Sequence, residues 1–174
     1  MTESSVLSFH DVAKTYGGSH LALDHVTFEV QEGEIFGLLG SNGSGKSTLL
    51  KIAATLLPQD GGHVTYFGSE VPISRRSLLS RMGVLFDHAA HFDHLTGYEN
   101  AYFFARSYGL PAAAARERLD LLFRRLDLSE RQNDPVSTYS FGMRRKLSII
   151  EALAHRPPIL LLDEPSIGLD YQAR

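Results

Sequence analysis

A nine-residue stretch, GSNGSGKST at residues 40–48, limits what this chain can fold into more than any other feature. Its glycines, Gly40, Gly43 and Gly45, tolerate backbone conformations that other residues avoid, so backbone N–H groups can wrap closely around an anion. The helical pattern that follows, GKSTLLKIAATLL, would bring the positive end of a helix dipole to the same place. The stretch therefore predicts a phosphate-binding loop, and a flexible glycine–serine linker is the weaker alternative.

Residue types within the loop predict what it binds. The Lys46 ammonium would reach the β- and γ-phosphates of a nucleotide, and the Ser47 hydroxyl would bind Mg²⁺. We therefore predict that a nucleoside triphosphate is held by Gly40, Ser41, Asn42, Gly43, Ser44, Gly45, Lys46, Ser47 and Thr48.

A second motif, ILLLDEP at residues 159–165, ends an apolar run with two acidic residues. Ligands bind at the carboxyl ends of strands in open α/β sheets, so Asp163 stands where it can hold Mg²⁺ through water. Glu164 is placed to polarise a water molecule against the γ-phosphate. The alternative is that the two acids merely cap the end of a strand. Beside a phosphate loop, they favour hydrolysis as well as binding.

Apolar patterns along the chain predict an α/β core with a helical insertion. The continuous runs EIFGLLG (34–40) and PILLLD (158–163) suit strands that are buried on both faces of a parallel sheet. The segments VLSFHDV and ALDHVTFEV alternate instead, as half-exposed strands do, with Val26, Phe28 and Val30 on one face. HVTYFG and MGVLF add two short strands, and the patterns from Leu95 to Ala154 are helical.

Composition excludes several classes of protein. A net charge of −3 offers no global basic field, so we expect no nucleic-acid partner. The absence of cysteine rules out disulfides and thiolate metal sites. The N-terminal MTESSVLSFHDV lacks the basic and apolar regions of a signal peptide, and the apolar runs are too short to span a bilayer. These features predict a soluble, intracellular protein.

A third motif, YSFGMRRKL at residues 139–147, begins a helical pattern with Ser140 as a good N-cap. Three consecutive cations follow, Arg144, Arg145 and Lys146. The N-terminal end of a helix dipole is positive, so cations there are destabilising and acidic residues would be stabilising. Either these charges form a solvated face, or this end of the helix meets an anion.

In this order, GSNGSGKST, YSFGMRRKL and LLLDEPSIGLD resemble the nucleotide-binding domain of ATP-binding-cassette (ABC) transporters, most closely the ATPase subunits of bacterial ABC-2 type exporters. The resemblance covers essentially the whole chain. It implies a P-loop NTPase core with a mostly parallel sheet, an N-terminal antiparallel β segment and a helical subdomain, about residues 95–155, inserted between the strands that carry the two nucleotide motifs.

The resemblance also implies a function. It indicates an ATPase that uses ATP and Mg²⁺, pairs with a second ABC domain as a homo- or heterodimer, and serves an integral membrane permease subunit. Such a protein is cytoplasmic and peripheral at the inner face of the membrane. The alternatives are a non-transport ABC ATPase of the translation-factor type and a nucleotide-binding module with impaired hydrolysis.

By the same resemblance, Tyr16 would stack on adenine, and SIGLD matches the loop at the dimer seam. Ser140 and the amide of Gly142 would bind the γ-phosphate held by the opposite subunit. Arg144, Arg145 and Lys146 would either add positive electrostatic potential near that phosphate or remain a solvated face.

The sequence departs from the family in three places. Phe141 replaces a signature glycine, and Asp87 replaces the glutamine of the Q-loop, where a carboxylate can still bind Mg²⁺ but adds negative charge. The chain also stops before the family's switch histidine. We therefore expect residues 1–174 to be a single ABC domain that is incomplete at its C-terminus and lacks one central strand.

The loop after residue 86 contains three histidines, His88, His91 and His94, at intervals of three. Three imidazoles could form a zinc site. Histidines in such loops are more often exposed residues with no ligand, and both interpretations stay open at this point.

Overall fold

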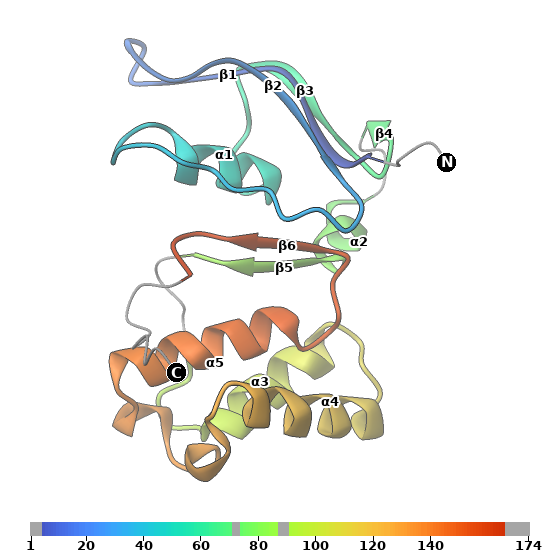
Figure 1. Cartoon of the computed structure of the whole chain (residues 1–174), viewed down its shortest axis with the longest axis vertical. Coiled ribbons are helices and arrows are strands. Elements are labelled where there is room, and N and C mark those ends of the chain that lie inside the picture. The colour runs from blue at the N-terminus through green and yellow to red at the C-terminus, as the bar shows by residue number, and fades with distance from the viewer. Residues whose placement is uncertain (1–4, 71–73, 87–90, 166–174) are drawn as a thin grey trace. The chain divides into compact units, whose positions relative to one another are not determined.

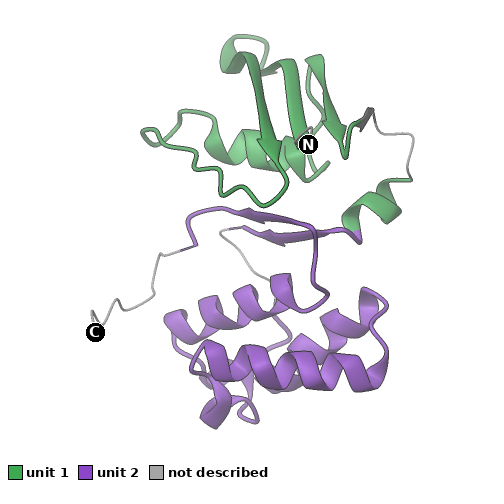
Figure 2. Ribbon diagram, turned by 45° about the vertical axis from the view of Figure 1, so that its right-hand side comes forward, with its two compact units in different colours: residues 1–79 green, residues 80–174 purple. Residues whose placement is uncertain are grey.

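The computed structural model describes residues 5–70, 74–86 and 91–165, and it divides the chain into two compact units, residues 1–79 and residues 80–174 (Figure 2). The first unit contains an antiparallel sheet, and the second contains a parallel strand pair with helices α3, α4 and α5 (Figure 1). Within the described ranges, no helix is long and apolar enough to cross a membrane.

The antiparallel sheet of the first unit has the strand order β2-β1-β3-β4. In β2, Val26, Phe28 and Val30 are half-buried while the residues between them are exposed, which confirms the predicted alternation. Phe28 lies opposite Phe9 of β1, and the two rings stack with their centroids 4.7 Å apart. The strands are β1 Ser5–Tyr16, β2 His20–Gln31, β3 Gly61–Tyr66 and β4 Ser69–Glu70.

Helix α1, Lys46–Ala53, packs against this sheet through one apolar face. Its buried residues are Leu49, Ile52 and Ala53. At its C-terminal end the carbonyl of Ala53 accepts a hydrogen bond from the buried Tyr66 hydroxyl at 2.7 Å. Strand β3 therefore holds the end of the helix whose first turn carries Lys46. A short helix, α2 Arg75–Leu79, completes the described part of the unit.

Residues 34–40, EIFGLLG, do not form the buried strand that their apolar run predicts. They adopt no regular secondary structure, and the side chains of Ile35 and Leu39 are 99% and 96% exposed. Phe36 does find a partner, because its ring stacks on Phe28 at 4.8 Å. A strand exists only through hydrogen bonds to a neighbouring strand, and in the described part of the chain none pairs with this segment. The prediction was wrong here because an apolar pattern specifies burial without supplying a partner.

The second unit is built on a parallel pair, β5 Met82–Leu85 and β6 Ile159–Leu162. Both segments were predicted as strands, and both are confirmed, but β6 is not buried on both faces as predicted, because Leu160 is 38% exposed. Helix α5, Phe141–Leu153, lies along this pair (Figure 1). The helix approaches β5 closely at Gly83, where an added Cβ would stand 2.2 Å from the Ala152 carbonyl oxygen. Only glycine at this position allows the helix to pack so near the strand.

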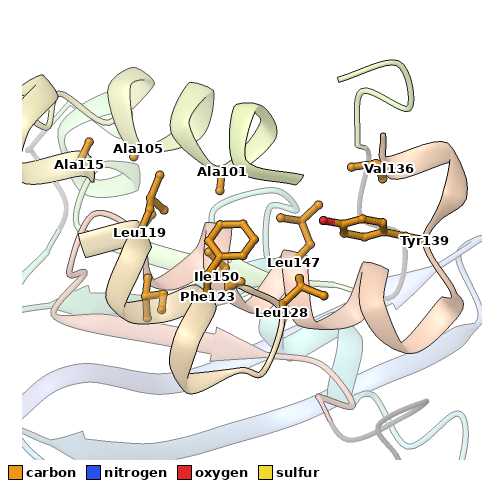
Figure 3. Close-up of a cluster of buried hydrophobic side chains, with 12 residues drawn as sticks. Ala101, Ala105, Ala115, Leu119, Phe123, Leu128, Val136, Tyr139, Leu147 and Ile150 are labelled. Atoms are coloured by element: carbon orange, nitrogen blue, oxygen red, sulfur yellow. The ribbon is translucent and has the colours of Figure 1, made fainter. Parts of the chain in front are cut away.

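The other side of α5 packs with helices α3, Gly97–Ser107, and α4, Ala112–Arg125, around a cluster of buried apolar side chains (Figure 3). Two short 3₁₀ helices, η1 Ser129–Arg131 and η2 Val136–Thr138, lead into α5. The stripe predicted on α4 is confirmed, since its members are buried in or packed against this cluster: Leu119, Leu122, Phe123 and Leu126. The same holds for the pattern predicted on α5: Met143, Leu147, Ile150 and Ala154.

Phe123 is fully buried in this cluster, and its replacement tests whether the three helices share one core. We expect Phe123→Ala to lower the free energy of unfolding by about 3–5 kcal/mol, because a large apolar side chain is lost and a cavity remains. Denaturant unfolding measures the change. Phe103→Ala is the matched control, because Phe103 on α3 is 49% exposed and should cost far less. Equal losses in the two variants would contradict the assignment of the core.

Candidate functional site

The phosphate loop predicted from the sequence leads directly into helix α1. No side chain caps the first backbone amides of this helix. Gly45 is the N-cap residue, with a left-handed φ of 92°, and it provides no side-chain hydrogen bond to the helix. By contrast, α3 and α5 are capped by the side chains of Thr96 and Ser140. Uncapped amides at a helix N-terminus are hydrogen-bond donors directed at whatever lies in front of the helix, and the helix dipole favours an anion there.

Two glycines of this loop have a close neighbour where a Cβ would stand, and at Gly45 that neighbour is backbone that cannot rotate aside. A Cβ at Gly45 would lie 2.4 Å from the Ala22 carbonyl oxygen of β2 and 2.9 Å from the Leu23 side chain. A Cβ at Gly40 would lie 2.6 Å from the Ser44 hydroxyl. The loop therefore closes tightly on itself and on β2, as a cradle for a phosphate group must.

Lys46 lies over the loop from the first residue of α1. Its ammonium donates hydrogen bonds to the carbonyl oxygens of Gly40 and Ser41, both at 2.8 Å. The neighbouring Ser47 is exposed and Thr48 is half-buried. The structure thus gathers a cation, a hydroxyl and uncapped amides at one end of the helix. This set can bind a phosphate and a divalent cation.

Tyr16 lies beside the same helix at the end of β1. Its hydroxyl is 3.4 Å from that of Thr48, and its ring is 40% exposed. The Lys14 ammonium lies 6.0 Å from the centroid of this ring, and a partly exposed aromatic ring beside a phosphate loop is the kind of group on which a flat base stacks.

Asp60, a residue that sequence reasoning missed, binds the two residues that precede Tyr16 on β1. Asp60 forms a 2.7 Å ion pair with Lys14 and accepts a hydrogen bond from the Thr15 amide at 2.8 Å. The hydrogen bond from Lys14, and then that from Thr15, lower the pKa of the Asp60 carboxyl. No sequence signal pointed to Asp60, because its partners lie on a strand that is remote along the chain.

The second unit carries the acidic pair at the end of β6. The Asp163 amide continues the strand ladder with a 2.8 Å hydrogen bond to the Leu85 carbonyl, and Asp163 is buried. Glu164 is exposed and has a left-handed backbone with a φ of 47°. Glu164 is one of seven non-glycine residues with a positive φ in the described part of the chain, so the conformation alone assigns it no role.

Helix α5 begins as the sequence predicts. Ser140 has extended backbone angles, and its hydroxyl accepts a hydrogen bond from the Met143 amide at 3.2 Å. Both Ser140 and Phe141 are exposed, the latter to 64%, and Gly142 is half-buried. The N-terminus of this helix is therefore accessible within its unit.

The three consecutive cations at this helix start have three different fates. Arg144 forms a 2.7 Å ion pair with Asp93. Lys146 donates to the Asp127 carbonyl at 3.4 Å. Arg145 is buried and donates to backbone carbonyls in two other segments. The expectation of one common role, whether a solvated face or a shared anion field, is therefore wrong for Arg145.

The His91 side chain is buried against α5, so neither interpretation of the histidine loop, a zinc ligand or an exposed residue, describes this histidine. Its Nδ1 lies 3.3 Å from a Glu151 oxygen, and its Nε2 lies 3.1 Å from the Ser148 hydroxyl. Both ring nitrogens have protein partners, so His91 is not available as a metal ligand in this conformation. Among the described residues, no group of three or more histidine, cysteine or acidic side chains could hold a metal ion.

Some predicted site residues lie outside the described residues. These are Asp87, the residue aligned with the Q-loop glutamine, His88, and the loop SIGLD at residues 166–170.

Comparison with known proteins shows what this chain is similar to. The model of the ABC transporter family matches residues 23–167. The chain is 42% identical over 153 residues to "Uncharacterized ABC transporter ATP-binding protein YdbJ" of Bacillus subtilis (strain 168), with 88% of the chain and 49% of the relative covered. It is 40% identical over 172 residues to "Nod factor export ATP-binding protein I" of Burkholderia pseudomallei (strain 1710b), covering 97% and 55%. The chain thus spans about half the length of these curated relatives.

Among solved structures, the chain is similar to the dimeric structure of a post-hydrolysis state of the ATP-binding cassette MJ0796 bound to ADP and Pi. The TM-score is 0.82 at 26% identity, and the alignment covers 95% of this chain and 76% of that one. This likeness extends over both units of the chain.

The buried Glu151 gives the stability of the second unit a pH dependence that can be tested. Burial raises the pKa of the Glu151 carboxyl above its ordinary 4.5, and the hydrogen bond with His91 offsets this only in part. The folded state therefore holds this proton more tightly than the unfolded state, so this group's contribution to stability falls as the pH rises from about 4.5 through the raised pKa. We expect Glu151→Gln to flatten that decline, as measured by denaturant unfolding across this pH range.

An exposed glutamate provides the control for this measurement. Glu117→Gln on α4 should leave the pH dependence as it is in the unmodified protein. An undiminished decline in Glu151→Gln would show that Glu151 does not cause it.

Proposed function

The chain belongs to the ABC transporter family of ATP-binding proteins, and from this we propose that it is the ATP-binding and ATP-hydrolysing subunit of a transporter that exports its substrate across a membrane. The observation that carries this proposal is the uncapped N-terminus of α1 behind a glycine-rich loop, with the Lys46 ammonium lying over it. The name of the Nod factor export relative supports export as the direction of transport.

In this proposal the phosphate loop holds the phosphates of ATP, and Tyr16 stacks on the base. On binding, the Lys46 ammonium exchanges the carbonyls of Gly40 and Ser41 for phosphate oxygens, which are stronger partners because they are charged. The amides at the start of α1 then gain the anionic partner that no side chain provides.

Mg²⁺ and water complete the chemistry. Ser47 and Asp163 are oxygen donors of the kind that Mg²⁺ prefers, and we propose that they hold the ion, Asp163 through water. Bound Mg²⁺ would neutralise charge on the phosphates. Glu164 accepts the proton of the attacking water as the water oxygen bonds to the γ-phosphorus and the bond from that phosphorus to the β–γ bridging oxygen breaks, which releases ADP and phosphate. We further propose Asp87 as a Mg²⁺ ligand, in the position of the Q-loop glutamine.

A second ABC domain completes the site. We propose that Ser140 and the Gly142 amide contact the γ-phosphate bound by the partner domain. The exposed, accessible N-terminus of α5 and the dimeric state of the related MJ0796 structure support this arrangement. Phe141, which is 64% exposed at this point, would then lie in the dimer seam.

Assembly and location follow from the same proposal. We propose a membrane permease subunit as partner and a cytoplasmic position at the inner face of the membrane. Residues 1–174 belong to one ATP-binding domain in this scheme, with a helical subdomain at about residues 95–155. The three helices packed around one core, between β5 and β6 in the chain, support that subdivision.

Replacement of Lys46 tests nucleotide binding. We expect Lys46→Ala to weaken ATP binding by about 10- to 100-fold, because a charge-assisted contact to phosphate is lost. Titration with a fluorescent ATP analogue measures the affinity. Lys51→Ala, at an exposed position in the last turn of the same helix, is the control and should bind normally. Equal affinity in Lys46→Ala and the unmodified protein would refute the phosphate-loop assignment.

Replacement of Glu164 tests hydrolysis in the complete natural protein. We expect Glu164→Gln to slow ATP turnover by about 10²- to 10⁴-fold while ATP binding persists, since an amide keeps the shape but cannot accept the proton. ATP should then be trapped in a dimer that size-exclusion chromatography with ATP and Mg²⁺ detects. Glu130→Gln, at an exposed position in η1, serves as the control. Undiminished hydrolysis by a monomeric Glu164→Gln variant would refute both the base and the shared site.

A further inference from the structure

Arg145 joins the start of α5 to the ends of both parallel strands. Its Nη2 donates to the carbonyl oxygens of Asp163, at 2.5 Å, and Glu164, at 2.6 Å. Its Nη1 donates to the carbonyl of Phe86, one residue beyond the end of β5, at 3.1 Å. The residue is only 6% exposed. A buried guanidinium is thus surrounded by backbone oxygens from two chain segments, and these are charge-assisted hydrogen bonds.

The two carbonyls held by Nη2 flank a single residue, Glu164. The Asp163 carbonyl lies in the peptide plane that precedes the Glu164 Cα, and the Glu164 carbonyl lies in the plane that follows it. Rotation about φ turns the first plane, and rotation about ψ turns the second. One donor that holds both oxygens therefore restricts both backbone dihedral angles of Glu164.

Glu164 needs such a restraint, because its φ of 47° lies in the left-handed region. Residues with a Cβ avoid this region, and they remain in it only where the surroundings hold them there. The direction of the Cα–Cβ bond, and with it the position of the carboxylate, follows from these angles. Release of either carbonyl would allow the backbone to relax and the carboxylate to move.

We propose that Arg145 is a positioning residue that holds the Glu164 backbone in its left-handed conformation and thereby directs the Glu164 carboxylate. The proposal rests on the proposed role of Glu164 as the base in ATP hydrolysis. It gives Arg145 a task different from those of its neighbours, since the Arg144 side chain pairs with Asp93 and the Lys146 side chain reaches Asp127. Arginine suits the task because its planar group offers several N–H donors at fixed angles, whereas lysine donates from one point.

The test compares variants of the complete natural protein in ATP turnover and ATP binding. Arg145→Met keeps the length of the side chain and removes every donor. We expect its kcat to fall by about 10- to 100-fold, the loss that a misplaced reacting group causes, with the KM and the affinity for ATP little changed. Arg145→Lys keeps the charge and one donor group, so its kcat should lie between those of Arg145→Met and the unmodified protein.

Arg118→Met is the matched control, because it removes an arginine that also donates to a backbone carbonyl. Arg118 is half-buried on α4, and its Nη2 donates to the Leu153 carbonyl at 3.3 Å. Its loss should lower stability without changing kcat, since Leu153 lies at the far end of α5 from Glu164. Thermal unfolding of all variants separates effects on stability from effects on turnover.

A double substitution shows whether Arg145 acts through Glu164. In the Glu164→Gln background, Arg145→Met should cause little further loss of turnover, because the group that it positions is already inactive. A full additional 10- to 100-fold loss in the double variant would overturn the proposal, since Arg145 would then act independently.

The outcomes also distinguish the proposal from the function on which it rests. If Glu164→Gln abolishes turnover while Arg145→Met turns over normally, the positioning role is wrong and the proposed function stands. If Glu164→Gln turns over normally, the base assignment fails and the positioning role fails with it. If Arg145→Met does not fold, Arg145→Lys decides: a lowered kcat at an unchanged KM supports positioning, and an unchanged kcat refutes it.

Discussion

The close packing of α5 on the parallel strands is the contact on which the functional groups of the second unit depend. It requires Gly83, because an added Cβ would meet the Ala152 carbonyl at 2.2 Å. With the helix seated there, its first turns lie near the carboxyl ends of β5 and β6, where Arg145 reaches Phe86, Asp163 and Glu164. A larger residue at position 83 would push the helix outward and break these contacts, although every residue that makes them would be unchanged.

The phosphate loop of the first unit obeys a similar constraint. At Gly45 the loop approaches the Ala22 carbonyl of β2 so closely that a Cβ would stand 2.4 Å away. The uncapped helix start is a consequence, because a glycine N-cap has no side chain with which to satisfy the amides. A loop that is sterically tight and electrostatically unsatisfied loses stability without its ligand and gains binding energy with it.

Buried polar groups around α5 divide into two kinds. The Nη1 and Nη2 atoms of Arg145 donate to backbone carbonyl oxygens, while its buried Nε has no hydrogen-bond partner among the described residues. Glu151, by contrast, shares His91 with Ser148, and burial still raises the pKa of its carboxyl. Arg145 thus meets backbone oxygens from remote segments, whereas the raised pKa of the buried Glu151 carboxyl makes stability depend on pH. One helix therefore carries both a guanidinium that joins chain segments and a carboxyl whose protonation affects stability.

Local sequence determined much of this protein. The glycine-rich loop before α1, the Ser140 cap of α5, the apolar stripe of α4 and the strands β5 and β6 were all predicted, because turn chemistry, capping and side-chain periodicity act over a few residues. The ABC family was identified from three such short motifs in order.

Tertiary structure decided what short-range patterns do not contain. The run at residues 34–40 has the composition of a buried strand, yet it is unpaired among the described residues, since a strand also needs a neighbour. Arg144, Arg145 and Lys146 are alike in sequence and differ in partners. Asp60 and His91 find their partners 45 and 57 or more positions away along the chain. The partner of each cation and the burial of each carboxylate depend on contacts between remote segments. Those contacts exist only once the chain has folded.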